Sequence, residues 1–208
     1  MKRKKRFVSA VLAVLLSFVL ATGAGAGDWH GYAVYRDGAT PQGIPLGLGN
    51  QWHAALMGEA TKNASYPVIH HSGSGYAKRD TWAAFMDGKN YMGIYRPKKA
   101  PNAAAFDSFV ATGRKLASDN ISYTLLNQLE YNTYSNWVYT SDITKIRCDG
   151  VVEYCYEWNN YRVYGADDCW DICYPSTRNK MEHSGVGSIN PKIQAQQYLT
   201  WLGNIQPT

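Results

Sequence analysis

Cys148 is the residue of this sequence with the clearest potential for covalent chemistry. It lies in the run 145–152, which predicts the first turns of a helix that begins at about Thr144. The unpaired N–H groups at a helix start stabilise a thiolate, and a neighbouring imidazolium lowers the thiol pKa further from its ordinary value of about 8.5. Because the thiolate is the reactive form, this position predicts that Cys148 is a nucleophile.

A thiol nucleophile needs a base, and two of the five histidines have a suitable context. His53 lies in the segment 52–57 and His70 in the segment 67–71, and both segments have the composition of strands. On neighbouring strands, one ring can accept the thiol proton while the second ring holds the first in place. The sequence therefore predicts His53 as the base and His70 as the orienting residue, with His71 on the opposite side of its strand.

These side chains need a framework, and the first half of the chain predicts a sheet. Four segments are rich in aromatic and β-branched residues, and clusters of Gly, Pro, Asn and Asp separate them. The predicted strands cover 32–36, 52–57, 67–71 and 91–96, with turns at Asp37-Gly38, 47–50 and Asp87-Gly88. Such a series of strands and turns predicts an antiparallel sheet.

The second half predicts helices. After Pro101, apolar residues recur at intervals of three and four, and Asn102 can cap the resulting helix. Further helices are predicted from about Thr144 and over 191–202, with a short strand at 161–164 between them. A sheet followed by helices predicts an α+β fold. No linker divides the segment 27–208, so we expect one domain.

Residues 1–26 have the parts of a signal peptide. Five basic residues at 2–6 precede an uncharged apolar stretch that starts at Phe7 and ends in the small residues Ala24-Gly25-Ala26. We expect cleavage after Ala26 and a secreted protein, extracellular or at the cell wall, with no membrane span after cleavage. The alternative is a retained anchor, because about twenty apolar residues can cross a bilayer.

Charge and cysteine content limit the possible partners. The leader contains five of the 21 Lys and Arg residues and none of the 16 Asp and Glu residues, so the rest of the chain has no net charge. We therefore expect no nucleic-acid partner. An exported chain can form disulfides among Cys148, Cys155, Cys169 and Cys173. Two bridges, or a free Cys148 with one bridge among the other three, are the alternatives.

Three motifs in this order resemble a known family. The similarity rests on Trp52-His53-Ala54-Ala55-Leu56-Met57, Val68-Ile69-His70-His71-Ser72 and, after a helix, Arg147-Cys148-Asp149-Gly150-Val151-Val152. The sequence resembles the NlpC-type papain-like cysteine hydrolases in circularly permuted order, as in YiiX-like and YebB-like hydrolases and the relatives of lecithin-retinol acyltransferase. It departs from the family at Asp149-Gly150, where Ser-Gly or Ser-Glu is common, and at Ala54-Ala55, where Val-Gly is common.

The resemblance implies a permuted papain-like fold with the nucleophile at a helix N-terminus. It implies Cys148 as nucleophile, His53 as base and His70 as third residue, with Tyr123 as a candidate to support the oxyanion. No metal or organic cofactor is expected for this chemistry, and we expect a monomer. A weaker alternative places a metal at Cys169 and Cys173 with His183, where a disulfide explains the cysteines as well.

For a secreted member of this family, the resemblance implies an amide bond of a peptidoglycan peptide as the substrate. Two alternatives stay open. A permuted relative would cleave lipid or other acyl esters with the same nucleophile. A non-catalytic, disulfide-bonded module would instead bind the cell wall or surface through its aromatic residues, with all four cysteines paired.

Overall fold

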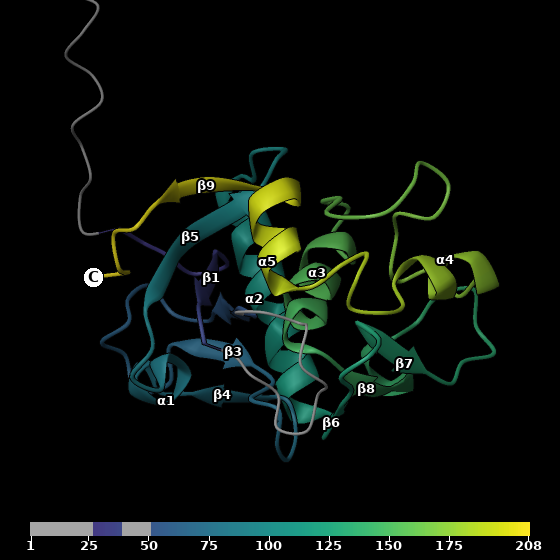
Figure 1. Ribbon diagram of the computed structural model, residues 1–208, viewed down its shortest axis with the longest axis horizontal. Coiled ribbons are helices and arrows are strands. Elements are labelled where there is room, and N and C mark those ends of the chain that lie inside the picture. The colour runs from purple at the N-terminus through teal and green to yellow at the C-terminus, as the bar shows by residue number, and fades with distance from the viewer. Residues whose placement is uncertain (1–26, 39–50) are drawn as a thin grey trace, which may run out of the picture.

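A six-stranded antiparallel sheet forms the centre of the computed structural model, which describes residues 27–38 and 51–208. The strand order is β4-β3-β2-β1-β5-β9, so the last strand of the chain closes one edge (Figure 1). The strands are β1 (Ala33–Arg36), β2 (His53–Met57), β3 (Val68–His70), β4 (Lys78–Asp80), β5 (Tyr91–Pro97) and β9 (Leu199–Gly203).

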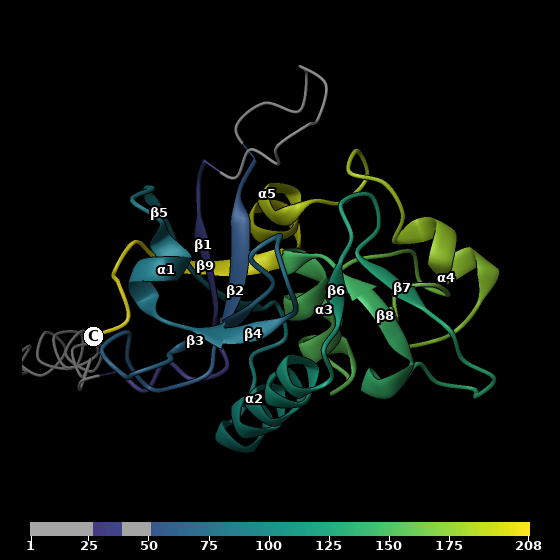
Figure 2. The same ribbon diagram turned by 90° about the horizontal axis from the view of Figure 1, so that it is seen from below.

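Helices cover both faces of this sheet. Figure 2 shows α1 (Trp82–Met86) on one side and, on the other, α2 (Ala103–Ser118), α3 (Cys148–Glu157) and α5 (Pro191–Ile193), which continues into the π-helical turn η2 (Gln194–Tyr198). A small second sheet lies beyond α3, in the order β6-β8-β7, next to α4 (Thr177–Glu182). Its strands are β6 (Ser122–Tyr123), β7 (Leu129–Tyr131) and β8 (Ile143–Ile146), and the 3-10 turn η1 (Thr140–Asp142) precedes β8.

The alternation of β2 divides its side chains between two cores. Ala54 and Leu56 belong to the larger core, which includes Val151 and Val152 of α3. Ala55 and Met57 belong to the smaller core on the other face, which Phe85 of α1 completes. Since side chains alternate along a strand, β2 is buried on both faces, and none of its residues is more than 6% exposed.

The predicted α+β class and the antiparallel sheet are confirmed, and the four predicted strands correspond to β1, β2, β3 and β5. The helix capped by Asn102 is also confirmed, since its side chain accepts from the Ala105 N–H. The leader 1–26 and the turn at 47–50 lie outside the described residues.

Three element predictions were wrong. The helix expected from Thr144 starts at Cys148, because 143–146 pair as β8 with β6 and β7. The helix expected over 191–202 ends at Tyr198, because 199–203 pair with β5 at the sheet edge. The strand expected at 161–164 is irregular chain, whose Val163 and Tyr164 N–H groups donate to the Glu157 carboxylate. In the first two cases a strand distant in sequence determines the backbone, and in the third the side chain of Glu157, six and seven residues earlier, does so.

Helix α3 is buried along its whole length, and it carries a row of acidic side chains. Asp149, Glu153 and Glu157 are four residues apart and therefore line one face of the helix, yet none is more than 1% exposed. Asp149 is compensated by a two-pronged ion pair with buried Arg147, at 2.6 Å from Nε and 2.8 Å from Nη2. Arg147 also donates to carbonyl groups of four other residues, Leu125, Leu126, Gly185 and Ile189.

Within residues 27–38 and 51–208, helices are too short or too polar to cross a bilayer.

The Arg147 pair gives a prediction about stability. Arg147→Met is expected to reduce the free energy of unfolding by about 3–5 kcal/mol, because it leaves a carboxylate buried without its partner. Urea denaturation followed by circular dichroism measures this. The matched control is Arg162→Met, which removes an ion pair with the fully exposed Asp167 and should hardly move the midpoint. Equal losses in the two variants would contradict the structural role given to Arg147.

Candidate active site

The structure brings His53 and His70 into direct contact. His53 is the first residue of β2 and His70 the last of β3, and their Nε2 and Nδ1 atoms lie 2.8 Å apart. Phe85 of α1 packs against both rings, with centroids at 5.6 and 5.8 Å. The two histidines are 6% and 1% exposed, so this is a buried, geometrically fixed pair.

Asp80 extends the pair into a chain of three groups. Its Oδ2 lies 3.4 Å from Nε2 of His70 and 2.8 Å from the Lys78 ammonium. Burial acts to raise the pKa of Asp80, but Lys78, the Thr81 N–H and His70 outweigh it, so the carboxyl pKa is lowered and the group is ionised at neutral pH. An ionised carboxylate only accepts, so His70 must donate from Nε2.

The direction of this hydrogen bond assigns the tautomers of both histidine rings. With its proton on Nε2, neutral His70 accepts at Nδ1, and the proton of that contact comes from Nε2 of His53. The remaining nitrogen of His53, Nδ1, is then unprotonated and can act as a base. Burial, with the neighbouring cationic groups, holds the pKa of His53 well below 6.5 and lowers that of His70 to about 4, so both rings are neutral at pH 7.

Cys148 lies at the first position of α3, against the start of β2. It is 3% exposed, and the N–H groups of Ala54 and Asp149 are close enough to favour its thiolate. Ala54 directly follows His53, and Arg36, which is paired in register with His53, is itself within electrostatic range of Cys148. The Cys148 sulfur therefore lies beside the backbone of β2 at Ala54, while the His53 ring packs with His70 and Phe85.

The expectation of a lowered thiol pKa is not met in this structure. Burial, together with the Asp149 carboxylate, raises the pKa of Cys148 to about 12, and the N–H groups and Arg147 only partly oppose this. The resting site therefore contains a thiol and neutral imidazoles. Sequence reasoning counted the helix start and an imidazolium but not the loss of water around the sulfur.

Gly150 allows α3 to approach the rest of the site closely. A Cβ at this position would lie 2.2 Å from the backbone oxygen of Gln128, a distance that atoms cannot adopt. The same oxygen accepts the N–H of Arg147, which immediately precedes the helix. Both residues of Asp149-Gly150 thus have a local role: Asp149 binds Arg147, and Gly150 makes room for the Gln128 backbone.

Tyr123 and His71 lie together on the other side of the site. Tyr123 in β6 is opposite Ile146 of β8, which leads into Cys148, and both burial and the nearby Cys148 raise the pKa of its phenol. His71 follows β3, its ring centroid is 4.9 Å from that of Tyr123, and its Nδ1 accepts the Gly73 N–H. His71 does not take part in the pair formed by His53 and His70.

Sequence reasoning missed Asp80 and Arg36. The strand that carries Asp80 has only three residues, all polar, and gives no alternation to detect. The position of Arg36 could have been predicted, since it ends a predicted strand and antiparallel pairing with the next strand can place it opposite His53.

All four cysteines are buried free thiols, including Cys155, Cys169 and Cys173. The expected disulfide among these three is therefore absent from the described chain. The alternative metal site at Cys169 and Cys173 is not formed either, because His183 instead lies beside Glu153 and Glu157.

Comparison with known proteins gives one weak similarity in fold. No protein-family model matches the sequence, and no curated protein matches it at a significant level. A solved structure, the crystal structure of metalloprotein YiiX from Escherichia coli O157:H7, a DUF1105 protein, aligns with 87% of this chain and 99% of its own. The TM-score is 0.47 and the sequence identity 13%, too low to carry an argument about function.

Proposed function

We propose that this protein is a cysteine hydrolase of the permuted papain-like type, with Cys148 as nucleophile, His53 as base and His70 as orienting residue. The observation that carries the proposal is the 2.8 Å contact between His53 and His70, in a sheet whose strand β2 also brings the Ala54 N–H to the Cys148 sulfur. The tautomers required by Asp80 leave His53 with one unprotonated nitrogen, which is what a general base needs.

The proposed reaction proceeds through an acyl-enzyme. Sγ of Cys148 attacks the carbonyl carbon while its proton moves to Nδ1 of His53, so a neutral thiol and a neutral imidazole react together. The C–N bond then breaks and the departing amine takes the proton from His53. Water, deprotonated by the same ring, hydrolyses the thioester and restores the thiol. His70 stabilises the transient imidazolium through its contact with Nε2 of His53, and Asp80 in turn orients His70.

An oxyanion needs donors near the sulfur. The first N–H groups of α3 have no partner within the helix and lie beside Cys148. The Tyr123 hydroxyl is the second candidate donor, and its raised pKa keeps it protonated. We assign it this supporting role as part of the proposal.

The substrate and location are proposed on the sequence alone. The expected leader would direct the protein out of the cell, where a peptidoglycan peptide is the amide substrate that the family resemblance suggests. An acyl ester requires the same nucleophile and is the second candidate. The disulfide-bonded binding module loses its main support, because the four cysteines are free thiols.

Four substitutions test the catalytic roles. We expect Cys148→Ala and His53→Ala to reduce turnover by about 10²–10⁴-fold each, and not additively, since both remove the same step. His70→Gln should retain more activity than His70→Ala, because the amide can still bond to the His53 ring. Hydrolysis of a cell-wall peptide, and of an activated ester if the peptide is inert, measures these effects.

The matched control is His71→Ala, since His71 is equally buried and adjacent in sequence but contacts Tyr123 rather than His53. It should affect turnover little in protein shown to be folded by circular dichroism. Inactive His71→Ala with active His70→Ala would reverse the assignment of the third residue. Full activity in all four variants would refute the hydrolase proposal.

Alkylation of Cys148 tests its protonation state. Because burial raises its pKa to about 12, iodoacetamide should label the folded protein more slowly at pH 7 than it labels a model thiol. The rate should rise about tenfold per pH unit above neutrality, because the thiolate fraction does so below the pKa. Mass spectrometry of peptides gives the site and rate, and urea-unfolded protein provides the fully accessible reference. A fast rate that does not change above pH 5 would instead indicate a preformed thiolate and imidazolium.

A further inference from the structure

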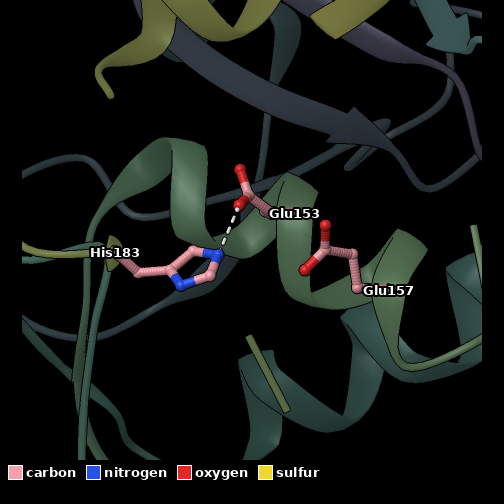
Figure 3. Close-up of side chains that lie close together, drawn as sticks. All are labelled: Glu153, Glu157 and His183. Atoms are coloured by element: carbon pink, nitrogen blue, oxygen red, sulfur yellow. Dashed lines mark ion pairs between the residues drawn. The ribbon is translucent and has the colours of Figure 1, made fainter. Parts of the chain in front are cut away.

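A second cluster of titratable side chains lies on α3, away from Cys148. Figure 3 shows Glu153 and Glu157 on this helix, with His183 reaching toward them from the segment that follows α4. One ligand-type atom from each residue lies within 4.8 Å of the others, and none of the three side chains is more than 3% exposed.

The hydrogen bonds of His183 leave one nitrogen facing a carboxylate. Nδ1 lies 2.8 Å from the backbone oxygen of Asn179, which can only accept, so Nδ1 carries a proton. In the neutral ring Nε2 is therefore a bare lone pair, and it lies 3.3 Å from Oε1 of Glu153. Neither of these two buried atoms has a hydrogen-bond partner. Two facing lone pairs repel, so either a proton or a metal ion must lie between them.

The other contacts of Glu153 and Glu157 hold both carboxylates in place. Oε2 of Glu153 accepts from the side-chain amides of Gln128 and Gln194, at 2.8 and 2.6 Å. Glu157 accepts three backbone N–H groups, those of Val163, Tyr164 and Ile172. These donors orient the two acids but contribute no positive charge, although a buried, charged carboxylate normally needs a cationic partner.

We propose that Glu153, Glu157 and His183 bind a divalent transition-metal ion of the zinc type. Donors bound to one tetrahedral zinc lie about 3.4 Å apart, given bond lengths of about 2.0–2.2 Å, and the Glu153 to His183 separation matches this spacing. A proton shared by charged groups would instead draw them to about 2.7–2.9 Å. An Nδ1–H bonded to a backbone carbonyl is also the usual support of a metal-bound imidazole.

One imidazole and two carboxylates select for Zn²⁺, Mn²⁺ or Fe²⁺ over Ca²⁺ and Mg²⁺, which prefer oxygen alone. Glu157 also lines a cavity of about 330 Å³ with Asp171 and Cys173, which gives the ion a route from solvent. The bound ion would attach α3 to the segment 158–190, in which α4 is the single helix or strand. Its role is therefore structural, independent of the proposed hydrolysis.

Zinc and cobalt binding to untagged protein tests the proposal. After removal of metal with EDTA, ZnCl₂ should bind in one equivalent that survives dialysis and should raise the melting temperature by several degrees, since about 1 kcal/mol corresponds to 2–4 °C at this chain length. The experiment uses a Cys148→Ser, His53→Ala background, so that the proposed catalytic groups cannot supply the site. CoCl₂ should give weak visible bands without the near-ultraviolet charge-transfer band of a thiolate ligand.

Two variants locate the ion. His183→Gln should abolish binding, whereas the matched control His30→Gln, which removes a histidine that also contacts two carboxylates at the surface, should bind like the parent. Gln194→Leu, which removes an orienting amide, should weaken binding about 10–100-fold. No zinc in the parent, equal binding in His183→Gln, or a thiolate band with cobalt would each overturn the proposal. The cobalt spectrum of the parent decides the matter even if His183→Gln does not fold.

Discussion

The burial of three carboxylates on one face of α3 is the constraint on which the rest of this structure depends. Asp149, Glu153 and Glu157 line a helix that has no exposed residue, so each acid needs a partner supplied from elsewhere. An unpaired charge in such surroundings costs several kcal/mol, comparable to the whole stability of a typical domain. The positions of Arg147, of two glutamine amides and of the chain after the helix all follow from this requirement.

The same requirement fixes Cys148, the proposed nucleophile. Because Arg147 binds Asp149, the residue between them is held at the helix start, and the glycine that follows allows the helix to reach the Gln128 backbone. Gln194 bridges the backbone oxygen of Asp149 and the Glu153 carboxylate, and it accepts the buried Tyr35 hydroxyl from β1. One polar network therefore connects α3 to the central sheet and to the C-terminal segment. The proposed active site gains its rigidity from groups that take no part in the chemistry.

Much of the fold could be predicted from sequence, and the elements predicted correctly are those that residues close in sequence determine. Strands β1, β2, β3 and β5 have β-branched and aromatic residues between clear turns, and Asn102 is a standard cap, so nearby residues determine these elements. Strands β8 and β9 could not be found in this way, since their backbone groups pair with segments distant in sequence. The short polar strand β4 had no pattern at all.

In the candidate site too, the features set by nearby residues could be predicted, and those set by distant segments could not. His53 and His70 could be paired because both lie on strands with a readable alternation, and the structure places their rings in contact. Asp80 and the thiol pKa depend on β4 and on desolvation, which a sequence does not reveal. The sequence also gives no sign that the three acids of α3 are buried, because segments outside the helix cover them.

The polar network also determines when the protein can fold during synthesis. Glu153 needs Gln194, and strand β5 needs β9, so both contacts depend on residues that follow Glu153 by 41 positions or more. While those residues are still within the ribosome, α3 has buried acids without partners and the sheet has an open edge. The core can therefore be completed only after residues 194–203 have emerged, and until then the buried acids and the sheet edge stay open to water and to proteases.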